Sequence, residues 1–394
     1  YLYLVLLFSF ILFFAIYQIA HKYTGTFFPI TGQVEYIDTY QKFNRHGTTV
    51  GFLDVTNQAG INIKSKNFGV AWGDYDNDGY DDIFISNLDD TSKLLRNIGK
   101  GSFRDVTNDV GIKNHIAYSA TFADIDNDGF LDLVIIGKGK PILYKNEKGK
   151  FHDVTKGSGI ENATGQRKGT ASFGDIDNDG YLDLIISYNG KPNFEKKISD
   201  LIIPYDENPY SYKNFSLSVI GHLYLFKNVR DGIFLDMSNS IPELSINEFR
   251  RFYQPIFFDY NNDNLIDIFI AIDTDYPVLL KNEGDFIFSY VSNLTNIYDK
   301  RSWMGASAGD YDNDGDFDLY VTAVKGDILY QNLDNNTFSI KNKLNRNSVA
   351  WGTIFIDYDN DGLEDIFVCN GDTSSTLNLS EFDDNAPSYH QITR

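Results

Sequence analysis

Six copies of one acidic loop constrain the fold of this chain more than any other sequence feature. Each copy has nine residues in the pattern D-x-D-x-D-G-x-x-D or a close variant, at 74–82, 124–132, 175–183, 259–267, 310–318 and 357–365. Successive copies start 50, 51, 84, 51 and 47 residues apart. A nearly constant period close to 50 residues indicates stacked copies of one supersecondary unit, and only the third interval is anomalous.

The sequence around each loop repeats as well. Small residues precede the loop, as in Gly69–Gly73, and an apolar β-rich run follows it, as in Ile83–Ile85. A stretch ending in Asn comes next, as in Leu94–Asn97, and a Phe-led strand such as Phe103–Thr107 closes the unit. Four short strands per unit are typical of a propeller blade. We therefore predict an all-β fold, a β-propeller of six or seven four-stranded blades whose small residues line the crowded axis.

The ends of the repeated region define the predicted domains. Phe52–Thr56 repeats the Phe-led strand without a blade before it, and in a closed ring it would complete the last blade. We assign residues 51–394 to the propeller and residues 23–50 to a linker. The long third interval contains an insertion at about 190–219 with several aromatic residues. We interpret this insertion either as a partner-binding segment or as a flap packed over the disc.

The first twenty residues carry no charge and are mostly Leu, Phe, Ile and Tyr. This run is long enough to span a bilayer as a hydrophobic helix, and no clear A-x-A cleavage site follows it. We favour an uncleaved signal anchor at residues 1–22, with a cleaved signal peptide or a buried core helix as the alternatives. Either signal would export the rest of the chain, so we expect an extracellular or periplasmic protein, anchored to the membrane if the segment is retained.

Charge and cysteine content exclude some classes of function. The formal net charge of -21 argues against nucleic acid as a partner, because binding phosphates requires a basic surface. Cys369 is the sole cysteine in the sequence, so the chain forms no internal disulfide and no cysteine-based metal site.

The loops fit calcium, which prefers six to eight hard oxygen ligands in a flexible cage. Carboxylates at loop positions 1, 3, 5 and 9 would converge on one ion, Gly at position 6 allows the turn, and position 7 offers its carbonyl. Magnesium requires a stricter geometry, and zinc would favour His or Cys, which no loop contains. The candidate ligands are Asp74, Asp76, Asp78, Tyr80 and Asp82; Asp124, Asp126, Asp128, Phe130 and Asp132; Asp175, Asp177, Asp179, Tyr181 and Asp183; Asp259, Asn261, Asp263, Leu265 and Asp267; Asp310, Asp312, Asp314, Asp316 and Asp318; and Asp357, Asp359, Asp361, Leu363 and Asp365.

Two other interpretations of the loops are less favourable. An EF-hand requires flanking helices and a Glu at position 12, where this chain has Ile85, Ile135, Ile186, Ile270, Val321 and Val368. A solvated acidic turn explains any single loop, but not six copies at one period. We therefore expect up to six structural calcium ions whose binding is coupled to folding. The site at Asp259–Asp267 should be the weakest, because Asn261 replaces a carboxylate and Asn264 replaces the turn Gly.

Basic residues recur seven to eleven positions before each loop and define a candidate ligand face. They are Lys66, His115, Arg167, Lys168, Arg250, Arg251, Arg301 and Arg346. In a meander the calcium loops occupy one face of the disc and these residues the other. Near the axis they would form an anion site for carboxylated sugars or acidic side chains. The alternative is a scattered, solvated set of charges.

The chain resembles the FG-GAP/VCBS calcium-propeller repeats, which also build integrin α-subunit heads, and more closely the cartilage acidic protein/ASPIC-UnbV group. The resemblance rests on Phe52–Thr56 with Ala59–Ile61, on Met304–Ala306 before the loop at Asp310, and on Trp351-Gly352 before the loop at Asp357. It implies an exported, non-catalytic binding or adhesion module with structural calcium. Family members usually continue beyond the last loop, so we expect that this chain is truncated at both ends.

Three classes of function stay open from the residues alone. We favour a binding module for a protein or carbohydrate ligand, because the sequence has no nucleophile elbow, Gly-rich phosphate loop or His-rich metal cluster. A calcium-dependent propeller enzyme, either a polysaccharide lyase or a phosphoester hydrolase, is the first alternative. A structural envelope or filament subunit is the second.

Overall fold

The computed structural model describes residues 43–45, 48–50, 54–63, 65, 67–165, 168–189, 222–241, 251–273, 275–324, 326–333, 335–344, 349–358, 360–371 and 390–393. The chain divides into two compact units, residues 1–55 and 56–394. In the first unit, β1 (Phe43–Arg45) and β2 (Thr48–Val50) form an antiparallel hairpin within the segment that we predicted to be a linker. Across the described residues, no helix has the length and apolar character needed to cross a membrane. The predicted signal segment lies outside those residues.

The second unit consists of six antiparallel sheets that follow one another along the chain. Five sheets have four strands and the sixth has three, each in a meander order. The strands are β3 Asn67–Gly73, β4 Asp82–Asn87, β5 Lys93–Asn97 and β6 Phe103–Asp105; β7 Ala117–Ala123, β8 Asp132–Gly137, β9 Ile142–Asn146 and β10 Phe151–Asp153; β11 Gly169–Gly174, β12 Asp183–Tyr188, β13 His222–Asn228 and β14 Phe234–Asp236; β15 Arg251–Phe258, β16 Asp267–Asp273, β17 Val278–Asn282 and β18 Phe288–Tyr290; β19 Trp303–Gly309, β20 Asp318–Ala323, β21 Asp327–Leu333 and β22 Thr337–Leu344; and β23 Val349–Ile356, β24 Asp365–Gly371 and β25 His390–Thr393.

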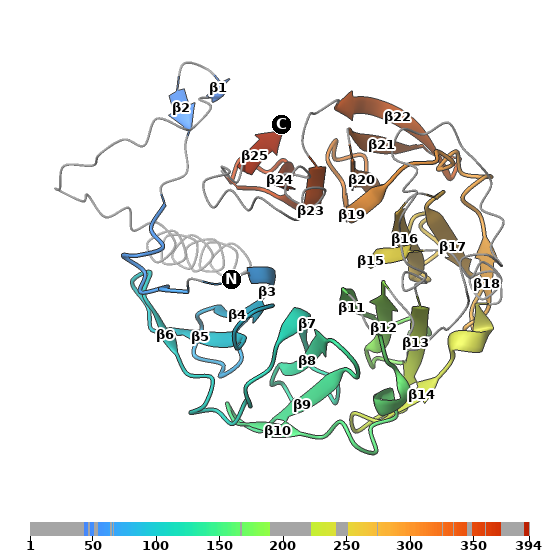
Figure 1. Ribbon diagram of the computed structural model, residues 1–394. Coiled ribbons are helices and arrows are strands. Elements are labelled where there is room, and N and C mark those ends of the chain that lie inside the picture. The colour runs from blue at the N-terminus through green and yellow to red at the C-terminus, as the bar shows by residue number, and fades with distance from the viewer. Residues whose placement is uncertain are drawn as a thin grey trace, which may run out of the picture. The chain divides into compact units, whose positions relative to one another are not determined.

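Within this unit the sheets are arranged as blades around a centre (Figure 1). The first strand of each sheet is innermost, and consecutive innermost strands contact one another from β3 through β23. Two short 3-10 turns, Ile160–Asn162 and Ser238–Ser240, lie near outer strands. The predicted all-β propeller is confirmed, and the described residues form six blades.

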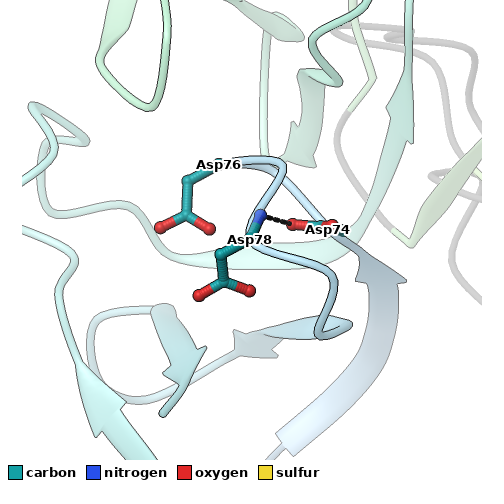
Figure 2. Close-up of side chains that lie close together, drawn as sticks. All are labelled: Asp74, Asp76 and Asp78. Carbon is teal, nitrogen blue, oxygen red and sulfur yellow. Dashed lines mark hydrogen bonds between the residues drawn. The ribbon is translucent and has the colours of Figure 1, made fainter. Parts of the chain in front are cut away.

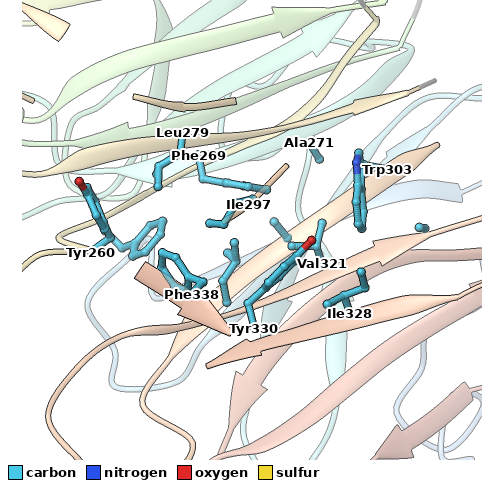
Figure 3. Close-up of a cluster of buried hydrophobic side chains, with 14 of the residues drawn as sticks. Tyr260, Phe269, Ala271, Leu279, Ile297, Trp303, Val321, Ile328, Tyr330 and Phe338 are labelled. Carbon is cyan, nitrogen blue, oxygen red and sulfur yellow. The ribbon is translucent and has the colours of Figure 1, made fainter. Parts of the chain in front are cut away.

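The hydrophobic core lies between neighbouring blades rather than inside one of them. One cluster joins Phe269 and Leu279 of the fourth blade to Trp303, Val321 and Tyr330 of the fifth (Figure 3). The second strand of a blade is covered on both faces, so β4, β8, β12 and β20 are buried along their whole length. This burial explains why those strands are continuous apolar runs instead of alternating patterns.

Small residues in the innermost strands are required by the close approach of neighbouring blades, as predicted. A Cβ atom on Gly69 of β3 would lie 2.8 Å from the carbonyl oxygen of Tyr118 in β7. A Cβ on Gly305 of β19 would lie 2.2 Å from the carbonyl oxygen of Trp351 in β23. Both separations are shorter than van der Waals contact, so any larger residue would push two blades apart.

The outer strands of the first, second, third and fifth blades are each tied to the turn that precedes their blade in the sequence. The Phe151 N–H donates to the Val110 carbonyl at 2.8 Å, and the Phe103 N–H donates to the Ala59 carbonyl at 2.8 Å. Ala59 therefore relates to the first blade as Val110 relates to the second. Residues 51–53 of the predicted closing strand Phe52–Thr56 lie outside the described part of the chain, as does the predicted insertion at 190–219, so both stay predictions.

Replacing Gly305 by Ala should destabilise the fold by about 1–3 kcal/mol, because the added methyl group meets the backbone of β23 and overpacks the contact. Gly352→Ala is the matched control, since a Cβ there would meet nothing within 4 Å and should change stability by less than about 0.5 kcal/mol. Urea unfolding in excess calcium measures both. Equal midpoints for the two variants would contradict the close packing of β19 against β23.

Candidate metal centres

The six loops connect the innermost strand of each blade to its second strand, as predicted. Position 9 is the first residue of the second strand in every blade, for example Asp132 in β8. Position 12 lies inside the same strand, where Ile135 is fully buried. The exclusion of the EF-hand is confirmed, because strands rather than helices flank the loops.

Hydrogen bonds within each loop hold the carboxylates in place. In the first loop, Asp74 accepts the N–H of Asp78 at 3.0 Å (Figure 2). Asp74 also accepts the N–H of Gly79 at 2.8 Å, and Asp78 accepts the N–H of Tyr80 at 3.0 Å. The position-1 carboxylate makes the same two bonds in the other five loops. This pattern makes each turn a fixed frame that orients acidic side chains. The predicted position-7 carbonyl ligands stay predictions.

An Asn at loop position 4 links each of the first four loops to the next, a role that was not predicted from the sequence. Asn77, Asn127, Asn178, Asn262, Asn313 and Asn360 all have φ between 56° and 58°. Asn tolerates this left-handed conformation better than most residues. The side chain of Asn77 donates to the Gly129 carbonyl of the second loop at 2.8 Å, and Asn127 donates to Gly180 of the third at 2.8 Å. The presence of Asn at this position in all six copies was the available signal.

The position-9 carboxylate and the Asn that ends the third strand form the second link between blades. Asp132 accepts the N–H groups of Ile125 at 3.0 Å and Asn146 at 2.7 Å. The amide of Asn146 donates to the Tyr75 carbonyl in the preceding loop at 2.7 Å and to Leu131 at 2.9 Å. The same link to the preceding loop occurs at Asn228, Asn282 and Asn332. This Asn recurs in the sequence, but its role was not predicted from the sequence.

Four loops bring three carboxylates together with ligand oxygens within 4.8 Å of one another. These clusters are Asp74, Asp76 and Asp78; Asp124, Asp126 and Asp132; Asp175, Asp177 and Asp183; and Asp310, Asp312 and Asp318. In the first three, the position-3 residue has a buried Oδ1 without a hydrogen-bond partner among the described residues. A buried, unpartnered carboxylate oxygen is costly unless a cation binds it. The donor set therefore fits a divalent metal ion with oxygen ligands, and the loops can hold one.

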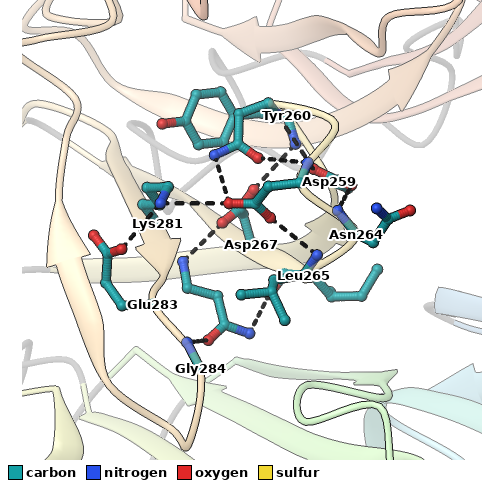
Figure 4. Close-up of polar contacts among 12 residues, drawn as sticks. Asp259, Tyr260, Asn264, Leu265, Asp267, Lys281, Glu283 and Gly284 are labelled. Atoms are coloured by element: carbon teal, nitrogen blue, oxygen red, sulfur yellow. Dashed lines mark hydrogen bonds and ion pairs between the residues drawn. The ribbon is translucent and has the colours of Figure 1, made fainter.

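The fourth loop differs in the way that its sequence predicts. Asn264 adopts φ 66° in place of the turn Gly, so its backbone still donates to Asp259, at 2.7 Å (Figure 4). Asn261 at position 3 donates its amide to Asp263 at 3.0 Å. That bond occupies an oxygen that a metal would use. In the sixth loop Asp359 lies outside the described residues, while Asp357 makes the usual two bonds at 2.9 and 3.0 Å.

The candidate ligand face is only partly described, because Lys66, Arg167, Arg250 and Arg346 lie outside the described residues. His115 pairs with the Tyr144 hydroxyl at 2.6 Å, and burial lowers the pKa of its imidazole. Arg251 pairs with Asp273 at 2.9 Å, and Arg301 pairs with Asp299 at 2.8 Å. Lys168 lies over the rings of Phe68 and Trp351, which come from two other blades. The convergence of the whole set on an anion stays a prediction.

Burial raises the pKa of the position-9 carboxyl group in each of the first five loops. The pKa reaches about 6 at Asp82 and about 7 at Asp132, Asp183, Asp267 and Asp318. Backbone N–H donors oppose this shift, and neighbouring loop carboxylates add to it. Without metal, these groups therefore bind protons near neutral pH in the folded state, whereas the unfolded chain releases them near the ordinary value of 3.8.

Replacing Asn146 by Ala should lower the free energy of unfolding by on the order of 2–4 kcal/mol, because three groups lose a hydrogen-bond partner. These groups are the Tyr75 and Leu131 carbonyls and the Gly149 N–H. Asn97→Ala is the matched control, since the side chain of Asn97 bonds, among the described residues, to the Asp81 carbonyl and the Gly99 N–H of its own blade. It should lose about half as much. Equal losses in urea unfolding would argue against a link between blades.

The stability of the metal-free chain should fall as the pH rises from about 4 to about 7. In that window the folded state binds more protons than the unfolded state, so raising the pH favours unfolding. In excess calcium the trend should reverse, because the ion requires deprotonated ligands. Urea midpoints from pH 5 to pH 8, with and without calcium, measure both trends. A metal-free midpoint that rises with pH would contradict the raised pKa values.

Comparison with known proteins agrees with this geometry. The FG-GAP-like repeat family matches residues 74–135, 125–186 and 259–321. No curated protein matches the chain. Similar solved structures include a lectin from Agrocybe aegerita, described as recognising non-reducing terminal N-acetylglucosamine, with 15% identity over 81% of this chain and 79% of the lectin and a TM-score of 0.48. The V. cholerae biofilm matrix protein Bap1 is 14% identical over 72% of this chain and 39% of its own, with a TM-score of 0.39.

The Dos1 propeller is 11% identical over 78% of this chain and 67% of its own, with a TM-score of 0.38. All three TM-scores are below 0.5, so these structures carry no part of the family assignment. The assignment rests on the repeat match and on the loop geometry. Membership of the cartilage acidic protein/ASPIC-UnbV group stays a prediction. The chain is a β-propeller that contains three FG-GAP-like repeats.

Proposed function

We propose that the chain is an exported calcium-binding propeller that acts as a binding or adhesion module for a protein or carbohydrate ligand. Calcium has a structural role in this proposal. The observation that supports it best is the set of buried position-3 carboxylates, each with one oxygen that has no hydrogen-bond partner among the described residues. Calcium would be held by the carboxylates at positions 1, 3, 5 and 9 and would supply the positive charge that these groups lack.

A structural role follows from what surrounds the carboxylates. The position-9 residue and the position-4 Asn of the same loop are already hydrogen-bonded within or between blades. An ion bound there would therefore stabilise the frame that joins neighbouring blades. The loops share the hydrogen bonds of the position-1 carboxylate, and among the described residues no loop has a further group that would single it out for chemistry on a substrate.

The ligand-binding surface that we favour lies at the other end of the innermost strands. The residue six positions before a loop is aromatic in four blades: Phe68, Tyr118, Tyr253 and Trp351. Phe68 lies 6.1 Å from Tyr118, and Tyr253 lies 6.4 Å from Trp351, measured between ring centroids. The Nζ of Lys168 lies 4.6 Å from the Phe68 centroid and 4.7 Å from that of Trp351. We call these five residues the axial cluster.

The chemistry of the axial cluster suits an acidic sugar or an acidic peptide. Aromatic faces offer large, rigid contact surfaces, and the lysine ammonium attracts a carboxylate. Phe68 keeps 43% of its surface exposed, so a ligand can reach it. Because the cluster is at the start of the innermost strands and the calcium loops follow their ends, a ligand here would not contact the ions.

Trp351→Ala and Lys168→Gln should each weaken ligand binding by about tenfold or more, because both remove part of the axial cluster. The measurement is binding of the whole chain, in calcium, to an array of neutral oligosaccharides, carboxylate-bearing oligosaccharides and acidic peptides. Trp72→Ala is the control, since Trp72 is an exposed innermost-strand residue that packs against Phe103. Equal binding by all variants would contradict the proposed surface. Conversion of an array compound to products would instead favour the enzyme alternative.

A further inference from the structure

A polar residue precedes the strand-ending Asn in each of the first five blades and reaches back to the calcium loop. It is a cation in four blades and an uncharged amide in the fifth. The five residues are Arg96, Lys145, Lys227, Lys281 and Gln331. We call them the counter-residues, because each lies against the acidic side chains of its own blade's loop.

In the first three blades the counter-residue binds one oxygen of the position-3 carboxylate. The Nε of Arg96 lies 2.7 Å from Asp76 Oδ2, and the Nη2 of Arg96 lies 2.9 Å from Asp78 Oδ2. Lys145 pairs with Asp126 Oδ2, and Lys227 pairs with Asp177 Oδ2. In all three blades the other oxygen of that carboxylate, Oδ1, is the buried atom without a partner.

This arrangement separates two effects of the counter-residue. The counter-residue holds Oδ2, through an ion pair at Asp76 and through hydrogen bonds at Asp126 and Asp177, and leaves Oδ1 available to a metal, which prepares the ligand for binding. Its charge compensates the acidic cluster when no metal is bound and repels a divalent ion when one arrives. The first effect requires only a donor, whereas the second requires a cation.

In the fifth blade an uncharged donor takes the place of the cation. The Nε2 of Gln331 donates to Asp312 Oδ2 at 2.6 Å, so the carboxylate is held by an uncharged group. The fourth blade is at the opposite extreme. Lys281 lies 3.4 Å from Asp263, and Asn261 supplies no charge at position 3.

We infer that the counter-residue sets the calcium affinity of its loop. Among the five blades whose counter-residue is described, Gln331 would make the fifth loop the tightest site and Lys281 would help to make the fourth the weakest. This inference rests on the proposed calcium binding. A unit charge about 5 Å from a divalent ion in water-like surroundings changes its affinity on the order of tenfold. Cations beside four of these loops would therefore give the five sites graded occupancy, with the fifth loop filled first among them as calcium rises.

An ordinary surface ion pair does not account for these contacts. Such pairs join exposed side chains and contribute little to stability. In the first three blades the position-3 partner is largely shielded, with 15%, 6% and 14% of the side chain exposed at Asp76, Asp126 and Asp177, and the contact recurs at the same repeat position. Lys93, which lies in β5 like Arg96, forms an ordinary surface ion pair. It pairs at 3.0 Å with Asp105, which lies outside the calcium loops.

The test compares Arg96→Gln with Lys93→Gln in the whole chain. Both remove one positive charge from β5, but only Arg96 contacts the calcium loop. Calcium affinity is measured by competition with a chromophoric chelator, and the melting temperature is measured in EDTA. We expect Arg96→Gln to raise one stepwise association constant about tenfold and to lower the metal-free melting temperature more than Lys93→Gln does. Gln331→Lys should lower the tightest constant by about tenfold.

The outcomes separate the inference from the proposed function. If the unmodified chain does not compete with the chelator for calcium, the proposed calcium binding fails. If it binds calcium but Arg96→Gln and Lys93→Gln share the same constants and the same metal-free melting temperature, calcium binding stands and the inference is overturned. Weaker calcium binding by Arg96→Gln would also overturn it, because the cation would then act only by orienting the ligand.

Discussion

The buried pair formed by the position-9 carboxylate and the strand-ending Asn is the interaction on which the rest of the structure depends. In the second blade, Asp132 and Asn146 are almost fully buried, and their bonds reach both ends of the loop and the preceding blade. Buried polar groups are tolerated only when they are hydrogen-bonded. A loop that loses its shape therefore exposes unsatisfied groups in two blades, so the geometry of one metal centre is coupled to its neighbour.

This coupling separates the two faces of the propeller by role. The loop face carries carboxylates whose raised pKa values and unpartnered oxygens suit a bound cation. The other end of the innermost strands carries the axial cluster, where Lys168 lies among aromatic rings from different blades. In the proposed function, rigid blades between the two faces would allow structural ions to support a ligand surface that they do not touch.

Much of the fold could be predicted from local repetition. The propeller was predicted from the period of the loops and from the apolar second strands. The EF-hand was excluded by the β-branched residues at position 12. All of these are short-range sequence patterns. Asn264 was recognised as a replacement for Gly because the left-handed conformation is a property of single residues, and its φ of 66° confirms this.

The contacts between blades could not be predicted in the same way. Asn178 bonds to the carbonyl of Asn264, 86 residues later, and nothing in the local sequence specifies that partner. The counter-residues were missed for a similar reason. Lys227 follows Asp177 by 50 residues, so a charge count treats it as an ordinary surface lysine, whereas strand pairing places it beside the loop.

Long-wavelength anomalous diffraction from crystals grown in calcium tests the central claim most directly, because it locates calcium without assuming its ligands. The account predicts anomalous peaks in the loops about 2.3–2.6 Å from the Oδ1 atoms of Asp76, Asp126 and Asp177, with the weakest or no peak at Asp259–Asp267. Loops without anomalous peaks, with their position-3 carboxylates bound only by the neighbouring Arg and Lys side chains, would contradict it.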